Sequence, residues 1–363
     1  MTLRKLNYCE KKEALFSISF QRFFYHCLLF VLTLTFVPTA EAESPNVVSD
    51  IKPVHSLVNM VLGDLGTSEL IISRNVSPHD YSMRPSEVRM VVDSDIIFWT
   101  GPVILPSFEK LFEELPPGTQ EISLLEEVED QLLPIRDLGS FFEDEDDHGD
   151  ENEEEGHDDD DHGDENEEEG HDDDDDHGEE KKSSGHDHSH EGDFDPHAWL
   201  DPYIALAWID IITDVMISED PDNKEVYLSN AKIAKAKINE LDQEIKARLH
   251  NIEPRFIVFH DAFQYFENRY GLTAIGIITD QSGAAPGARH IRQLVDKISE
   301  VEVSCAFSEP LFEDDLLNTV VSGAEIIVYE IDPTGAGLEP EPDLYLNLIS
   351  KVADSFIECA SAG

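Results

Sequence analysis

Positive charge is scarce in this chain. Its 363 residues contain 25 lysines and arginines against 79 aspartates and glutamates, a formal net charge of −54. A surface of this kind repels nucleic acid and anionic membranes and attracts cations. We therefore expect no nucleic-acid partner, and the length is ample for two domains of ordinary size.

Long hydrophobic runs are also lacking. The apolar run 27–37 is about half the ~20 residues that a membrane-spanning helix needs, and no later segment could span a bilayer. Basic residues precede this run, and Pro38 and the small-residue frame Ala40-Glu41-Ala42 follow it, a pattern typical of a secretory signal. The alternative is an anchoring helix. We predict that residues 1–42 are a signal peptide, cleaved after Ala42, and that the mature protein is exported.

Cysteine is rare, with four residues in the chain. Removal of the signal would take Cys9 and Cys27 and leave Cys305 and Cys359. In an oxidising compartment these two thiols could form a disulfide, or they could stay as two buried free thiols.

Enzymatic signatures are missing. The sequence has no nucleophile–base arrangement, no glycine-rich phosphate loop and no His-Glu-x-x-His helix. We therefore predict a protein that is not an enzyme. The rival interpretation, a zinc hydrolase, would need a general base beside the metal and a substrate pocket.

Acidic residues are concentrated in an insert, residues 143–193, where 29 aspartates and glutamates face two lysines. The segment 148–161 recurs directly as 162–175 and contains no apolar residue, so it cannot bury a core, and we predict that the insert is disordered. Its histidines are weak metal ligands that could collect or buffer Zn²⁺, although the insert could also be only a solvated segment. They are His148, His157, His162, His171, His177, His186, His188 and His190.

Outside the insert, short apolar runs alternate with amphipathic helices, which indicates βα units and parallel sheets. The predicted fold is α/β, with two lobes that each have a central, mostly parallel sheet flanked by helices. We place the N-terminal lobe in residues 43–220, a linker helix in 221–252 and the C-terminal lobe in 253–363. The linker has no hinge glycine, so we expect modest lobe movement. The apolar runs are Val47–Ile51, Glu69–Ser73, Asp95–Trp99, Glu121–Leu125, Phe256–Phe259, Thr273–Ile278, Val303–Phe307 and Glu325–Ile331.

Three histidines stand in loops at the ends of strands or at a domain edge: His79, His197 and His260. Ligands of α/β proteins bind at the carboxyl ends of strands, so we predict that these imidazoles converge on one Zn²⁺ in a cleft between the lobes. Nearby aspartates could orient the rings. Asp332, which also ends a strand, is the candidate fourth ligand, with water as the alternative.

Several short blocks together resemble the periplasmic zinc-binding proteins of bacterial ABC importers, in the order in which that family carries them. The blocks are Ser77–Ser86, Trp99–Pro102, His197–Pro202, Phe259–Phe263, Phe307–Pro310 and Ile331–Gly335. The resemblance implies two lobes around a rigid linker helix, a metal site in the cleft with His79, His197 and His260 as ligands, a disulfide between Cys305 and Cys359, and a histidine-rich acidic loop.

The same resemblance implies a function and partners. The protein would capture Zn²⁺ and deliver it to an ABC-type permease with its ATPase, and we expect it to be a monomer. Some zinc members have Glu directly before the first ligand histidine, whereas this chain has Pro78. Manganese members place a carboxylate where His260 stands, so a third imidazole favours Zn²⁺. A manganese-binding member, or a metal buffer or adhesin without a transport role, is the alternative.

Overall fold

The computed structural model describes residues 44–142 and 194–362. The predicted signal peptide and the acidic insert with its eight histidines lie outside the described residues, so those predictions stay as they stand. In the described ranges, no helix combines the length and apolarity needed to cross a membrane.

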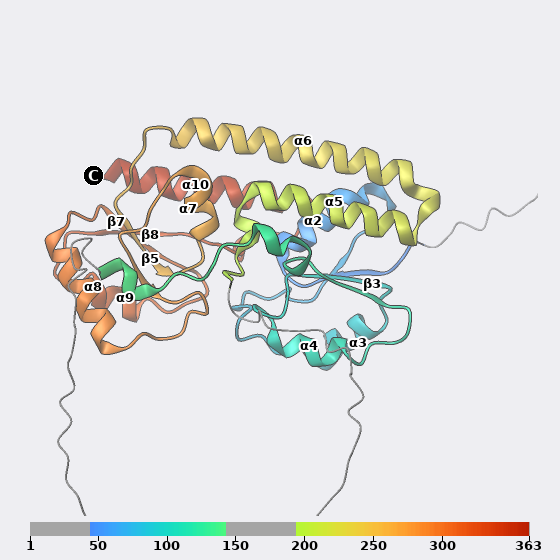
Figure 1. The fold of residues 1–363 in the computed structure, drawn as a ribbon, viewed down its shortest axis with the longest axis horizontal. Helices are drawn as coiled ribbons and strands as arrows, with labels where there is room; N and C mark the ends of the chain where they lie inside the picture. Colours follow the sequence, from blue (N-terminus) through green and yellow to red (C-terminus); the bar gives the residue numbers. More distant parts are fainter. Residues whose placement is uncertain (1–43, 143–193, 363) are drawn as a thin grey trace, which may run out of the picture. The chain divides into compact units, whose positions relative to one another are not determined.

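Two four-stranded parallel sheets organise the described residues (Figure 1). The sheet of the N-terminal lobe has the order β2-β1-β3-β4, and the sheet of the C-terminal lobe has the order β6-β5-β7-β8. The strands are β1 (Val47–Ser49), β2 (Glu69–Leu70), β3 (Ile96–Trp99), β4 (Gln120–Ser123), β5 (Phe256–His260), β6 (Gly276–Thr279), β7 (Cys305–Ser308) and β8 (Ile327–Glu330). The predicted α/β fold with two parallel sheets is confirmed.

Helices cover the sheets, which explains why the central strands are apolar runs: β3 and β5 are buried along their whole length. The helices are α2 (Lys52–Leu62), α3 (Pro85–Val92), α4 (Pro106–Phe112), α5 (Pro202–Glu219), α6 (Lys224–Leu249), α7 (Gln264–Tyr270), α8 (Ala288–Glu300), α9 (Asp315–Val320) and α10 (Leu344–Ala362). Short 3-10 turns lie at Gly63–Leu65, Glu126–Gln131, Leu138–Phe142, Ala198–Leu200 and Pro221–Asn223.

The long helix α6 runs beside helices that belong to both halves of the protein, with α2 and α5 along one half of its length and α10 along the other (Figure 1). It begins three residues later than predicted, because Pro221–Asn223 form a 3-10 turn. That turn is fixed by Asp220, whose Oδ2 accepts hydrogen bonds from the Asn223 side chain and the Tyr227 hydroxyl.

A second connection joins the two lobes, in addition to the predicted linker helix. At the start of α2, the buried Lys52 ammonium donates to the carbonyl groups of Gly335, Ala336 and Leu338 at 2.9–3.1 Å. One turn later, the Ser56 hydroxyl donates to the carbonyl of Pro342 at 2.6 Å. The lobes are therefore also tied through α2, which the periodicity of the sequence did not reveal.

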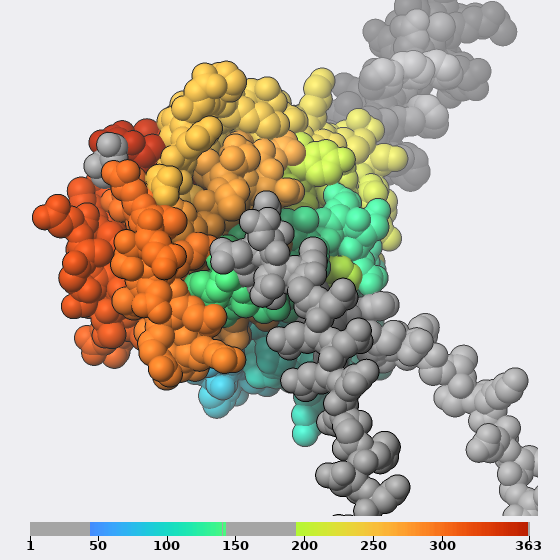
Figure 2. All heavy atoms as spheres, turned by 60° about the vertical axis from the view of Figure 1, so that its left-hand side comes forward, coloured from blue at the N-terminus to red at the C-terminus, as the bar shows by residue number. Residues whose placement is uncertain are grey.

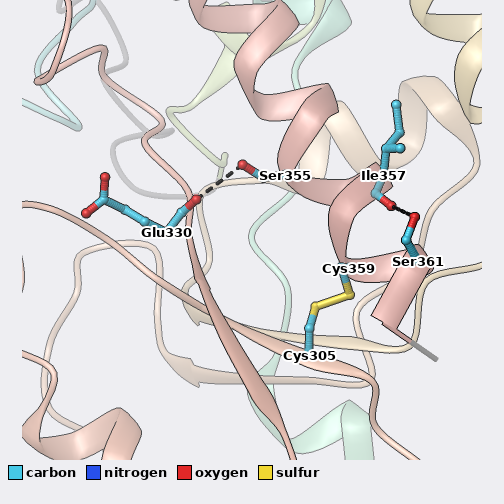
Figure 3. Close-up of a disulfide and its surroundings, with 6 residues drawn as sticks. All are labelled: Cys305, Glu330, Ser355, Ile357, Cys359 and Ser361. Atoms are coloured by element: carbon cyan, nitrogen blue, oxygen red, sulfur yellow. Dashed lines mark hydrogen bonds between the residues drawn. A yellow bond between two sulfur atoms is a disulfide. The ribbon is translucent and has the colours of Figure 1, made fainter.

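The predicted disulfide is present. Cys305, the first residue of β7, is bonded to Cys359 near the end of α10, with Cα atoms 5.5 Å apart and both residues fully buried (Figure 3). Beside it, the Ser355 hydroxyl donates to the carbonyl of Glu330 in β8 at 3.2 Å. The disulfide and this hydrogen bond hold α10 against the sheet of the C-terminal lobe.

Candidate metal centre

His79 lies in the loop that follows β2 and is half-buried. The loop is held by its neighbour Tyr81, which is buried and donates to the carbonyl of Ile71 at 3.3 Å. The Ser107 hydroxyl donates to the carbonyl of Tyr81 at 2.9 Å. Among the described residues no carboxylate hydrogen-bonds to the His79 ring. Its position is thus set by the loop backbone and not by a side-chain partner.

His197 is buried and stands directly before the 3-10 turn Ala198–Leu200. The Oδ1 atom of Asp195 accepts hydrogen bonds from the His197 backbone amide at 3.0 Å and from its Nδ1 at 2.8 Å. The turn itself is fixed by Trp199, whose indole N–H donates to the carbonyl of Pro333 at 2.7 Å. With Nδ1 donating to Asp195, the Nε2 atom of His197 keeps a free lone pair for a metal.

His260 is the last residue of β5 and is buried. Its Nδ1 donates to Oε1 of Glu309 at 2.7 Å, and Glu309 directly follows the neighbouring strand β7. Because parallel strands end at the same edge of a sheet, the pairing of β5 with β7 places this carboxylate beside the ring. As at His197, the Nε2 atom is left free to bind a metal.

The three imidazoles converge. The Nε2 atom of His197 lies 3.4 Å from that of His79 and 3.3 Å from that of His260. Each of the three residues offers one ligand atom within 4.8 Å of the others. Zn–N bonds of 2.0–2.1 Å in a tetrahedron place neighbouring nitrogens about 3.3 Å apart. The spacing at His197 therefore fits a tetrahedral zinc ion.

Burial and nearby charges shift the pKa values of the three imidazole rings differently. Burial, together with the neighbouring His197 and His260, lowers the pKa of His79 to about 2. Burial also holds the pKa of His197 well below its usual value. Burial would lower the pKa of His260 too, but the charge and hydrogen bond of Glu309, with the charges of Asp261 and Asp195, outweigh it, so this pKa is raised. His79 and His197 are thus neutral and ready to bind a metal at neutral pH, whereas His260 competes with a proton.

One buried oxygen near the site lacks a partner. Asp195 is 1% exposed, and its Oδ2 atom has no hydrogen-bond partner in the structure. Burial raises the pKa of Asp195 to about 7, although the amide of His197 and the charge of Arg136 lower it. A divalent cation at the three imidazoles would compensate the charge that this carboxylate carries when ionised.

A small cavity at the three rings has largely apolar walls. Trp199 contributes one aromatic wall. Phe312 contributes the other aromatic wall, with its ring 5.1 Å from that of His260. The complete lining is Ser77, Pro78, His79, His197, Trp199, His260, Glu309, Leu311, Phe312, Pro333 and Thr334.

Asp332 is not brought together with the three histidines. Its Oδ1 accepts hydrogen bonds from the amides of Thr334 and Gly335 at 2.9–3.0 Å, and its Oδ2 accepts one from the amide of Gly337 at 3.1 Å. Gly335 has a positive φ of 73° in this turn. The Asp-Pro-Thr-Gly sequence is typical of such an aspartate-capped turn, so the sequence itself indicated that Asp332 binds the backbone of its own turn.

The carboxylates that orient the rings are only partly those expected from sequence proximity. Asp195 binds His197 as predicted, whereas Asp261 binds Arg136 and not the adjacent His260. Glu309, which is distant in the sequence, orients His260 instead.

Comparison with known proteins identifies the family. Residues 47–359 match the family described as zinc-uptake complex component A, periplasmic (ZnuA). A high-affinity zinc uptake system protein ZnuA from Brucella suis biovar 1 is 39% identical over 320 residues, which cover 88% of this chain and 92% of the relative. The protein of the same name from Paracoccus denitrificans is 38% identical over 325 residues, which cover 89% and 94% of the two chains.

Solved structures share the fold. The periplasmic zinc-binding protein TroA from Treponema pallidum superposes with a TM-score of 0.65 at 15% identity, covering 87% of this chain and 99% of that one. A crystal structure of a ZnuA protein gives a TM-score of 0.62 at 18% identity, covering 86% and 99%. Since the family match spans most of the chain and these two relatives are 39% and 38% identical, the chain belongs to the ZnuA family, the periplasmic component A of zinc-uptake complexes.

Proposed function

We propose that this protein captures Zn²⁺ in the periplasm with His79, His197 and His260 and delivers it to an ABC-type permease in the inner membrane. The observation that carries the proposal is the 3.3–3.4 Å spacing of the Nε2 atoms around His197, which suits tetrahedral zinc. The names of the relatives, which are high-affinity zinc uptake system proteins, support the same function.

Water completes the coordination in this proposal, because the Asp332 carboxylate is engaged by its own loop. Three neutral imidazoles and a water favour Zn²⁺ over Mn²⁺, which prefers oxygen ligands. The apolar walls formed by Trp199 and Phe312 limit access of bulk water to the ion. Delivery requires the site to open, and the half-buried His79, which has no carboxylate partner among the described residues, is the ligand best placed to leave first.

The acidic insert, residues 143–193, serves in this proposal as a collector of Zn²⁺ for the cleft site. Its net charge of −27 attracts cations, and its histidines bind zinc weakly. The rival function is a metal buffer in which the insert holds the zinc and the cleft has no role.

The test is calorimetric titration with Zn²⁺ and with Mn²⁺ of three proteins: the intact chain, a deletion of residues 143–193, and His197→Ala. We expect one tight zinc site that survives the deletion, is lost in His197→Ala and discriminates against Mn²⁺. Tight binding that disappears with the insert and persists in His197→Ala would establish the buffer function instead. Stronger binding of Mn²⁺ than of Zn²⁺ would identify a manganese protein.

A further inference from the structure

A segment of the chain crosses from the N-terminal lobe to the C-terminal lobe next to the metal site. After the 3-10 turn Glu126–Gln131, residues 132–136, here called the strap, pass to the C-terminal lobe, where Leu138–Phe142 packs against α8 (Figure 1). In the space-filling view, residues 131–142, drawn in green, lie between the orange surface of the C-terminal lobe and the blue-green surface of the N-terminal lobe (Figure 2).

Arg136 fixes the strap to the loop that carries His260. Its Nε donates to both carboxylate oxygens of Asp261 at 3.1 Å, and its Nη2 also binds Asp261. Its Nη1 donates to Oε2 of Glu267 at 2.8 Å. The side chains of Asp261 and Glu267 are 3% and 4% exposed, so both charges depend on the guanidinium for compensation. Asp261 is the residue immediately after the metal ligand His260.

The strap is also bonded to the segment that carries His197. The amide of Asp195 donates to the carbonyl of Leu133 at 2.9 Å. The hydroxyl of Tyr265 accepts from the Leu133 amide at 3.0 Å and donates to the carbonyl of Asp195 at 2.7 Å. The strap therefore contacts Asp195, which orients the His197 ring, through Leu133, and it contacts Asp261, which directly follows His260, through Arg136.

We propose that Arg136 is a positioning residue for metal binding, which holds the His260 loop at the distance from His197 that a zinc ion requires. This inference rests on the proposed zinc-binding function. The guanidinium touches neither the ion nor an imidazole. It acts through Asp261 and through the strap, whose other end is bonded to Asp195. The competing explanation is an ion pair that only stabilises the fold.

The protein contains a matched control for that competing explanation. Arg269 in α7 binds Asp242 of α6 with Nε at 2.9 Å and Nη2 at 2.8 Å. The exposures are also alike: the Arg136 and Arg269 side chains are 18% and 20% exposed, and those of Asp261 and Asp242 are each 3% exposed. Each arginine also has a second carboxylate partner, Glu267 at 2.8 Å for Arg136 and Asp201 at 3.4 Å for Arg269, and Asp242 is shared with Lys246. The two ion pairs are therefore similar in geometry and burial, but the aspartate that binds Arg269 is not next to a ligand histidine.

The experiment compares Arg136→Lys with Arg269→Lys in the full chain. Lysine keeps the positive charge but cannot form the bidentate contact with the carboxylate. We expect both variants to lower the melting temperature, whereas only Arg136→Lys weakens zinc binding, by about 10–100-fold, the usual effect of losing a group that supports a ligand. The absorption spectrum of bound Co²⁺, which reports coordination geometry, should change in Arg136→Lys and stay as in the wild type in Arg269→Lys.

Equal zinc affinities and equal Co²⁺ spectra in the two variants would overturn the proposal and leave Arg136 as a stabilising ion pair. If Arg136→Lys fails to fold, Tyr265→Phe provides the second test, because it removes the hydroxyl link to Asp195 without unpairing a charge. An unchanged zinc affinity in Tyr265→Phe would then overturn the proposal. Failure of the wild-type protein to bind zinc at all is a different result, which would refute the zinc-binding function itself.

Discussion

The candidate metal ligands are supported in different ways: carboxylates bind the His197 and His260 rings, whereas among the described residues none binds His79. In the C-terminal lobe, His260 ends a buried central strand, and the residue after the adjacent strand, Glu309, binds its ring. In the N-terminal lobe, His79 lies in a loop nine residues after β2, and among the described residues no carboxylate binds it. We therefore expect that the His197 and His260 rings are held in place before metal arrives, whereas His79 is brought into position by the ion. A site of this kind can bind tightly and still release its ion by movement of one loop.

The largest expected effect comes from removing ligands on the two sides. His260→Ala should weaken zinc binding on the order of 1,000-fold, because a pre-organised ligand is lost and Glu309 is left without its partner. His79→Ala should cost less, about 10–100-fold, because part of the gain from this ligand is spent on ordering its loop. Competition titration against a chromophoric chelator measures the zinc dissociation constants of both variants.

The exposed His250, which follows α6, provides the control: His250→Ala should bind zinc like the wild type. Equal losses in His79→Ala and His260→Ala would contradict the difference between the two sides.

The disulfide tests how far the rigidity of the C-terminal lobe depends on a covalent link. Replacing Cys305 and Cys359 together by serine should lower the free energy of unfolding by about 4 kcal/mol, since the disulfide spans 54 residues. Chemical denaturation measures this difference. Zinc affinity at 25 °C should change less than about threefold, because β5 and β7 stay paired through their backbones. A large loss of affinity would show that the bond, and not the sheet, positions Glu309.

Glu309→Gln keeps the size of the side chain that binds His260 but removes its charge. We expect zinc affinity to fall by about 10–100-fold, in the range seen when a carboxylate that orients a ligand histidine is changed. Glu244→Gln, at an exposed position of α6, is the control for the loss of a carboxylate charge and should keep the affinity. An unchanged zinc dissociation constant in Glu309→Gln would mean that β5 alone orients the His260 ring.

The smallest effect is a shift along the pH axis. A proton on His260 excludes the metal, and Glu309 raises the pKa of this ring above its ordinary value, so zinc affinity should begin to fall at a higher pH than for a free imidazole. In Glu309→Gln, burial is no longer opposed by this charge and the pKa drops, so the decline should move to lower pH. Titrations between about pH 5 and 8 would detect the shift; identical profiles for the two proteins would contradict it.

Local sequence patterns predicted most of the fold and the three histidines whose rings converge. Buried strands such as β5 are recognisable because they are short apolar runs between turn residues, and His260 stands visibly at the end of one. The elements that the sequence did not reveal depend on contacts between distant segments. Arg136 binds Asp261 over a separation of 125 residues, and Lys52 binds a loop more than 280 residues away. No local periodicity encodes such pairs. Asp332 shows the opposite case, since its position after a strand suggested a ligand while its turn sequence directed the carboxylate to backbone amides.

The most direct test of the central claim is anomalous diffraction at the zinc absorption edge from crystals of the zinc-loaded protein. One strong peak should lie about 2.0–2.1 Å from the Nε2 atoms of His79, His197 and His260, with a water in the fourth position. A peak confined to other residues, or a zinc ion bound by fewer than three of these imidazoles, would contradict the account.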